Sequence, residues 1–342
     1  MPRTPARSYR KMRIHPAPPM QIARSLAELA PSAAPSVVTI GNFDGVHCGH
    51  QAVIAKVKRR AEALAARSVV VTFEPHPTHL LETKARTALL TPLPRKLELL
   101  AATGVDLVLV LPFTEELRLL TARQFAESVL CQALQTLEIH EGETFRFGHR
   151  AEADMDGLTR LGQELCFRVE AYLPVVRRGA PVSSSRIRQL VAAGNVSAAR
   201  ALLGRPFAVD STPARGRGYG TRYAVPTVNL APYAELLPAH GVYITTLRIG
   251  EGLATRTFRG VTNAGNRPTF GADSYAVESH LFDFEPLELT EQTPLRLTFL
   301  DRLRGEQRFA SPEELVAQIG KDVTRARQYF HLCDLRGVSL AS

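Results

Sequence analysis

The chain has 342 residues, of which 45% are hydrophobic and 22% charged, so it is long enough for two domains of ordinary composition. No apolar run approaches the ~18 residues of a membrane-spanning helix, and we expect no membrane partner. The formal net charge is +9, but residues 1–24 hold six Lys and Arg residues and no Asp or Glu. The rest of the chain is only weakly basic, which argues against nucleic acid as a partner.

We expect residues 1–24 to be a basic, disordered extension. Two alternatives are an organelle transit peptide and translation that begins at Met12. The cysteines show no paired spacing, which argues against a disulfide framework or a cysteine-based zinc site and suits a cytoplasmic protein; they are Cys48, Cys131, Cys166 and Cys333.

The first half alternates between strand-like and helix-like segments. Strands are expected at 37–40, 68–73, 105–111 and 137–140, and helices at about 49–67, 94–103 and 121–136. This alternation predicts an α/β fold with a parallel sheet covered by helices, in which ligands bind beyond the carboxyl ends of the strands.

The second half changes character after two further helices at 185–193 and 196–203. Short β-like runs at 242–249, 255–261, 276–284 and 295–300 predict a small antiparallel barrel. A last helix is expected from Ser311, its cap, to about Phe330. With a boundary near Gly204, the predicted domains are 25–203 and 204–342.

Two histidines at the start of a predicted helix point to phosphate binding. His47 and His50 are three residues apart, so they share a helix face, and a helix N-terminus presents free N–H groups to an anion. Glycines at 41, 45 and 49 allow close approach of the backbone. Two alternatives are a metal site, with His47, Cys48 and His50 as ligands, and a turn without a ligand.

A second segment, Val182–Arg188, reads as a helix capped by serine. Arg186 and Arg188 lie in its first turn, where the helix dipole disfavours cations. A bound anion such as pyrophosphate would offset that cost.

The chain resembles a known family in these motifs. Residues 41–50 (GNFDGVHCGH) and 182–188 (VSSSRIR) are similar to the nucleotidyltransferase superfamily. Together with 72–77 (TFEPHP) and 145–148 (FRFG), they resemble the bacterial bifunctional riboflavin kinase/FAD synthetases. The resemblance runs from about Val37 to Phe330 and implies a Rossmann-like nucleotidyltransferase sheet followed by a riboflavin kinase barrel.

The resemblance implies that the FMN phosphate attacks the α-phosphorus of ATP and that pyrophosphate leaves. His47 and His50 would then be catalytic donors to the ATP phosphates, while Ser184 and Arg186 would hold pyrophosphate with Mg²⁺. The implied ATP-binding set is Gly41, Asn42, Phe43, Asp44, Gly49, Ser184, Ser185 and Arg186. Phe147 would line the flavin pocket, although an aromatic residue in a strand can also be core. Thr144 departs from the acidic or amide residue usual in the family.

The second half carries the remaining motifs. Residues 216–220 (GRGYG) read alone as a flexible loop. The runs 226–229 (PTVN), 241–243 (GVY), 263–270 (NAGNRPTF) and 277–280 (VESH) resemble the riboflavin kinase barrel.

This second resemblance implies that Gly216, Gly218 and Gly220 bind the ATP phosphates. It also implies that Thr227 and Asn229 bind Mg²⁺ together with ATP. Glu278 would be the catalytic base for the ribityl hydroxyl, and Arg304 would help close the flavin site. The alternatives are that Thr227 and Asn229 serve turns and that Glu278 is a solvated residue of a strand. Departures from the family pattern stand at Ser211, Pro213, Thr221 and Ala224, so we expect an active kinase with weakened ATP binding.

The predicted function is therefore phosphorylation of riboflavin to FMN and adenylylation of FMN to FAD, with riboflavin, FMN and ATP as small-molecule partners. One alternative is a monofunctional FAD synthetase whose barrel only binds flavin or serves regulation. Another is a regulatory flavin- or RNA-binding protein on a retired enzyme scaffold. The sequence leaves homo-oligomer formation open.

Overall fold

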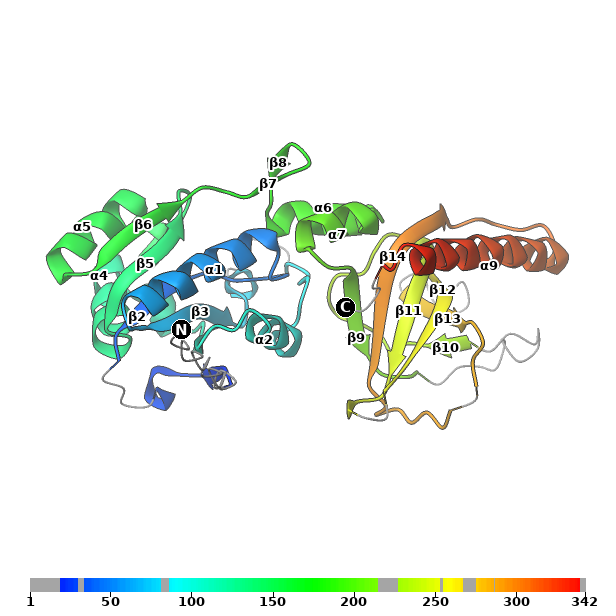
Figure 1. The fold of residues 1–342 in the computed structure, drawn as a ribbon, viewed down its shortest axis with the longest axis horizontal. Helices are drawn as coiled ribbons and strands as arrows, with labels where there is room; N and C mark the ends of the chain where they lie inside the picture. The colour runs from blue at the N-terminus through cyan, green and yellow to red at the C-terminus, as the bar shows by residue number, and fades with distance from the viewer. Residues whose placement is uncertain are drawn as a thin grey trace, which may run out of the picture.

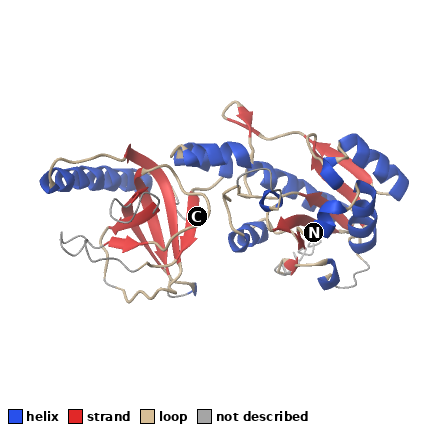
Figure 2. Ribbon diagram, turned by 180° about the vertical axis from the view of Figure 1, so that it is seen from behind, coloured by secondary structure: helices blue, strands red, loops and turns tan. Residues whose placement is uncertain are grey.

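The computed structural model describes residues 19–29, 34–80, 86–214, 227–252, 255–266, 275–285 and 287–338. An α/β half and a β half lie side by side and are joined by two helices (Figure 1). Figure 2 shows from behind that the helices of the first half surround its sheet, whereas the second half carries one long helix.

The first half is built on a six-stranded parallel sheet in the order β1-β4-β3-β2-β5-β6. Its strands are β1 (Gln21–Ala23), β2 (Ser36–Ile40), β3 (Arg67–Glu74), β4 (Leu107–Pro112), β5 (Thr136–Gly142) and β6 (Arg168–Tyr172). The helices between them are α1 (Cys48–Ala63), α2 (Leu93–Ala101), α3 (Glu115–Leu119), α4 (Ala122–Phe125) and α5 (Met155–Leu165). Short 3₁₀ turns lie at Leu26–Glu28, Pro77–His79 and His149–Ala151.

Both faces of this sheet are covered, as expected for parallel strands. Along β2, Val37 packs with Ile54 and Leu100 from α1 and α2, while Val38 packs with Leu130 and Leu158 on the opposite face. The alternation of side chains along a strand therefore builds two apolar layers. The predicted parallel sheet is confirmed.

Two details differ from the sequence-based expectation. The predicted disordered extension 1–24 is wrong for Gln21–Ala23, because these residues form β1 and pair in parallel with Leu107–Leu109. The single helix expected at 121–136 is the short α4 followed by a π-helix, Ala126–Ala133. Both segments still bury apolar side chains against the sheet, among them Phe125 and Val129.

The second half is an antiparallel sheet in the order β10-β13-β12-β11-β14-β9. Its strands are β9 (Phe207–Ser211), β10 (Thr227–Asn229), β11 (Gly241–Ile249), β12 (Arg256–Asn266), β13 (Tyr275–Leu281) and β14 (Leu295–Gly305). The two edges approach each other, because Ala214 N–H donates to Asn229 O at 2.9 Å and Pro213 bridges to Leu230. The sheet therefore curls toward closure, as the predicted barrel requires, and α9 (Pro312–Leu335) packs on β12 and β14 with Ser311 as its cap.

The helices α6 (Ser184–Ala192) and α7 (Val196–Leu203) join the two halves, preceded by the hairpin β7 (Val176–Arg177) and β8 (Ala180–Pro181). The apolar side chains of α6 and α7 belong to the barrel's core. Ile187 and Leu202 lie in one buried cluster with Tyr243 and Phe299 of the barrel. The core of the second half therefore begins before residue 204.

Candidate active sites

The first candidate site lies where the strand order of the parallel sheet reverses, between β2 and β5. The two strands pair as far as Val38 and Ile139. Beyond that point Ile40 N–H donates to the side-chain carboxyl group of Glu141 in β5 at 2.5 Å. Burial raises the pKa of Glu141 well above its usual value. The strands thus part at their carboxyl ends, which is where ligands bind in sheets of this type.

His47 and His50 lie at this edge, at the start of α1. His47 is the cap of α1, and its Nδ1 accepts the N–H of His50 at 3.3 Å. The two rings stack with centroids 3.6 Å apart. Because Nδ1 accepts a hydrogen bond, the proton of a neutral His47 is on Nε2, which makes Nε2 a donor.

Burial keeps both imidazoles neutral. Desolvation, opposed in part by Asp44, lowers the pKa of His47 to about 4. Burial lowers the pKa of His50 well below its usual value. Both side chains are therefore neutral hydrogen-bonding groups at pH 7, able to donate to phosphate without carrying charge.

Asp44 joins the turn after β2 to two other segments. Its carboxylate, 2% exposed, accepts the N–H groups of Leu90 and Thr91 at 3.1 and 3.0 Å. It also accepts from Arg188 Nη2 at 2.8 Å. Three donors from two other segments therefore hold the Asp44 carboxylate and tie the turn to them.

The two motifs of the first half meet at the start of α6. Ser184 Oγ donates to the main-chain oxygen of Asp44 at 2.8 Å, and Ser183 caps α6. Arg186 turns toward the β7–β8 hairpin, where its Nη1 donates to three carbonyls, including that of Ala180 at 2.9 Å. Arg188, which was not among the predicted site residues, instead reaches the turn. Ser185 is exposed beside them.

Lys96 is a site residue that sequence reasoning missed. It is buried, and its Nζ donates to Asn42 O at 3.2 Å and lies 3.4 Å from Thr72 Oγ1. Desolvation lowers its pKa, with Glu74 and Asp44 opposing. Its position could have indicated its burial, because it lies on the apolar face of α2 with Leu93, Leu97 and Leu100 and is the charged residue among them.

The remaining predicted residues of the turn have structural contacts. Phe43 is buried against α1, and its ring lies 4.9 Å from that of His50. A side-chain carbon at Gly49 would lie 3.1 Å from the His47 ring, and one at Gly41 would lie 3.3 Å from Phe43. Glycine at these positions therefore allows the imidazole and phenyl rings to lie against the backbone.

Phe147, the predicted flavin contact, follows β5 in a loop rather than in a strand. It stacks on Phe145, with centroids 5.4 Å apart, and meets Phe125 of the core edge-on. Thr144 is exposed. Phe147 is thus partly core, and its contact with flavin stays a prediction.

The second candidate site lies on the barrel. Asn229 of β10 pairs directly opposite Glu278 of β13, and Glu278 pairs opposite Asn263 of β12. Directly opposed residues share a face of the sheet with Cβ atoms ~5 Å apart. Thr227 pairs with His280 at the start of the same ladder. Gly216, Gly218, Gly220, Thr221 and Ala224 lie outside the described residues.

Arg304 contacts other side chains of the protein. Its Nε donates to the buried carboxylate of Asp322 on α9 at 2.9 Å, and its guanidinium lies 5.7 Å from the centroid of the Phe309 ring. Gln318 donates to the second oxygen of Asp322 at 3.0 Å. Arg304 therefore fastens β14 to α9, and a flavin contact stays a prediction.

Within the part of the chain that the structure describes, no group of three or more His, Cys, Asp and Glu side chains is arranged to hold a metal ion. Nor is any described helix both long and apolar enough to cross a membrane.

Comparison with known proteins places both halves. The family described as FAD synthetase matches residues 29–186, and the family described as riboflavin kinase matches residues 203–330. The first half is therefore an FAD synthetase domain and the second a riboflavin kinase domain.

Relatives carry both domains in one chain. A bifunctional riboflavin kinase/FMN adenylyltransferase of Pseudomonas fluorescens is 38% identical over 309 residues, which cover 90% of this chain and 97% of the relative. The protein of that name from Escherichia coli K12 is 35% identical and covers 92% and 99%. The chain belongs to the family of bifunctional riboflavin kinase/FMN adenylyltransferases, which confirms the resemblance found in the sequence.

A solved structure has the same two-part fold. A crystal structure titled as a macrolide-efflux protein from Streptococcus pneumoniae superposes with a TM-score of 0.78 at 26% identity, covering 89% of this chain and 97% of that one. The likeness extends over both halves.

Proposed function

We propose that the barrel phosphorylates riboflavin with ATP and that the first half adenylylates the resulting FMN to FAD. The observation that carries the second step lies between β2 and β5, where the strand order reverses. There the turn between β2 and α1 (the histidine turn, residues 41–47) meets the start of α6 through the hydrogen bond from Ser184 to Asp44. Two helix N-termini converge there beside neutral His47 and His50, which suits a triphosphate.

In the adenylyl step, an FMN phosphate oxygen attacks the α-phosphorus of ATP and the bond to pyrophosphate breaks. Such a transfer needs alignment and charge stabilisation more than covalent help. The His47 Nε2–H donates to a phosphate oxygen, and His50 lies against it. Lys96 and Arg188 supply positive charge beside the turn, and the start of α6 receives the departing pyrophosphate.

In the kinase step, Glu278 accepts the proton of the ribityl 5′-hydroxyl while that oxygen attacks the γ-phosphorus of ATP, the bond from that phosphorus to ADP breaks, and ADP leaves. The hydroxyl, amide and carboxylate oxygens of Thr227, Asn229 and Glu278 are the hard donors that Mg²⁺ prefers, and the register supports their convergence. Bound there, Mg²⁺ would neutralise charge on the ATP phosphates. The four cysteines are free thiols, which fits a reducing cytoplasm as the site of action.

The direct test is to incubate the purified chain with ATP, Mg²⁺ and either riboflavin or FMN and to separate the products by chromatography. We expect FMN and FAD from riboflavin, and FAD from FMN. His50→Ala should reduce FAD formation about 10²–10³-fold, the usual cost of a lost transition-state donor, and should spare FMN formation. FAD from FMN but no FMN from riboflavin would favour the monofunctional alternative.

A further inference from the structure

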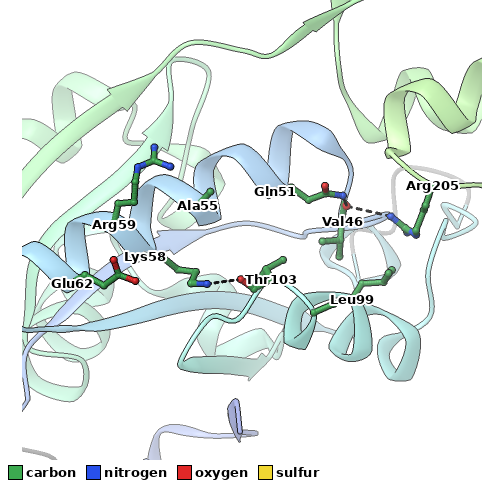
Figure 3. Close-up of a pocket in the computed structure, with 10 residues that line it drawn as sticks. Val46, Gln51, Ala55, Lys58, Arg59, Glu62, Leu99, Thr103 and Arg205 are labelled. Carbon is green, nitrogen blue, oxygen red and sulfur yellow. Dashed lines mark hydrogen bonds between the residues drawn. The ribbon is translucent and has the colours of Figure 1, made fainter. Parts of the chain in front are cut away.

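Arg205 holds the main chain of the turn between β2 and α1 just before His47. It follows α7 in the short segment before β9, outside every motif considered above. Its Nη2 donates to Gly45 O at 2.7 Å and its Nη1 to Val46 O at 3.3 Å. Figure 3 shows the guanidinium pointing at Val46, at one end of a surface pocket of about 480 Å³ beside α1. These two carbonyls immediately precede His47.

The backbone at this point is strained. Phe43 and Val46 have φ values of 46° and 36°, in the left-handed region that a β-branched residue such as valine strongly disfavours. Conformations of this kind persist only where the surroundings over-determine them. The fork of Arg205 supplies such a constraint, because two parallel donors fix both the position and the direction of the carbonyl pair.

Neighbouring residues reinforce the same placement. Gly45, with φ of 85°, packs so closely that an added side-chain carbon would lie 2.9 Å from Leu90 and 3.4 Å from Leu203. Gln51 donates to Val46 O at 2.8 Å and to Leu203 O at 3.2 Å. The end of α7 and the segment after it therefore form a solid support behind the turn.

The guanidinium of Arg205 is a half-buried charge whose hydrogen-bond partners are neutral. None of the described carboxylates forms an ion pair with it, and Arg95 and Arg296 lie close enough to repel it. Desolvation, with Arg95 next, lowers its pKa to about 10. A half-buried cation whose hydrogen-bond partners are neutral carbonyls is favoured by a nearby anion, and a polyphosphate bound at the turn would supply one.

We propose that Arg205 is a positioning residue for adenylyl transfer, which holds the Gly45 and Val46 carbonyls and thereby fixes the main chain that carries His47. The inference rests on the proposed adenylyltransferase activity. Arg205 lies within residues 203–330, the part matched by the riboflavin kinase family. The adenylyl site is thus completed by a residue of the other domain, and Arg205 acts without touching substrate.

The test uses the full-length chain with Arg205→Gln and Arg205→Lys. In each preparation we would measure kcat and KM for FMN adenylylation and for riboflavin phosphorylation. We expect Arg205→Gln to lower the adenylylation kcat by about 10–100-fold, since a misplacement of about 1 Å can cost 10²-fold. Phosphorylation should stay within about twofold. Lysine keeps the charge and one donor, so Arg205→Lys should recover part of the loss.

Arg296→Gln is the matched control. Arg296 also bridges the halves, because it pairs with Asp210 of its own half and donates to Glu98 of α2 at 3.0 Å, but it does not contact the turn. We expect this variant to keep the adenylylation kcat within about twofold of wild type, as expected for a residue remote from the reacting groups.

Three results would overturn the proposal: an unchanged kcat in Arg205→Gln, an equal loss in Arg296→Gln, or a parallel loss of both activities. If Arg205→Gln does not fold, Arg205→Lys decides, because an unchanged adenylylation kcat in that variant removes the role. Failure of the wild-type chain to make FAD would instead contradict the proposed function itself.

Discussion

Arg188 and Asp44 form an ion pair at 2.8 Å with the carboxylate 2% exposed, and it links α6 to the turn between β2 and α1. The pair brings together two motifs 144 residues apart. A carboxylate at this depth is stabilised only while its donors remain, so its removal has a measurable consequence.

Asp44→Asn should destabilise the first half and reduce FAD formation. The amide keeps the shape but leaves Arg188 without its partner and replaces one acceptor oxygen by a donor facing N–H groups. Breaking one side of a buried pair typically costs about 3–5 kcal/mol of unfolding free energy. Denaturant unfolding of Asp44→Asn, compared with the exposed control Glu115→Gln, checks this. Equal midpoints for the two variants would mean that the pair contributes nothing.

The neutral imidazole of His47 predicts a pH-dependent stability. Its folded pKa of about 4 lies below the usual 6.5, chiefly because of burial. The unfolded chain therefore binds a proton first as the pH falls. Stability is complete above about pH 6.5 and declines between pH 6.5 and about 4, by on the order of 3 kcal/mol for this group.

His47→Asn should flatten that decline. Asparagine is a good helix cap, so α1 keeps its start while the titrating group is lost. The measurement is the unfolding free energy at pH 7 and at pH 5. His331→Asn, on the exposed side of α9, is the control and should keep the wild-type slope. A slope in His47→Asn identical to wild type would assign the decline to other groups, such as His76, whose pKa burial also lowers to about 4.

Glu278→Gln should lower the turnover of riboflavin phosphorylation at saturating ATP. The substitution keeps the strand register opposite Asn229 and Asn263 but removes the proton acceptor, a loss that typically costs about 10²–10⁴ in rate. FAD formation from supplied FMN should not change. Glu285→Gln, which removes an exposed carboxylate paired with Arg256, is the charge-matched control. Wild-type turnover in Glu278→Gln would exclude this base.

A fragment of residues 182–342 should be more stable than one of residues 204–342. The shorter fragment lacks α6 and α7, whose Ile187 and Leu202 pack with Tyr243 and Phe299 in one cluster. Exposed apolar surface costs about 25 cal/mol per Å², so several uncovered side chains lower stability noticeably. Circular dichroism with denaturant gives the two midpoints. A shorter fragment that is at least as stable would place the boundary at 204 after all.

Strong periodicity made the fold predictable. The run 36–40 is buried throughout and the helices beside it have one apolar face, so the sheet and its helices could be expected from the sequence. The strand β1 could not, because its three residues carry no pattern and pair only through tertiary contact with β4.

Site residues were predictable where a local motif carried them. His47 and Ser184 stand at helix starts, and the structure places both segments at one edge of the sheet. Arg205 was missed because a single arginine after a helix has no sign of its contacts in the sequence. Lys96 was missed although its place on the apolar face of α2 was a signal. Their roles depend on contacts that only the folded chain brings about.

The segment Leu89–Thr91 is fixed by three consecutive N–H groups that donate to carboxylates. The N–H groups of Leu90 and Thr91 are donated to Asp44, and that of Leu89 is donated at 2.7 Å to Glu235 in the barrel half. Surface connections usually tolerate changes in length. Here one inserted residue would shift at least one of three consecutive donors away from its carboxylate. This short connection is therefore a place where insertions and deletions are excluded, although it belongs to neither a helix nor a strand.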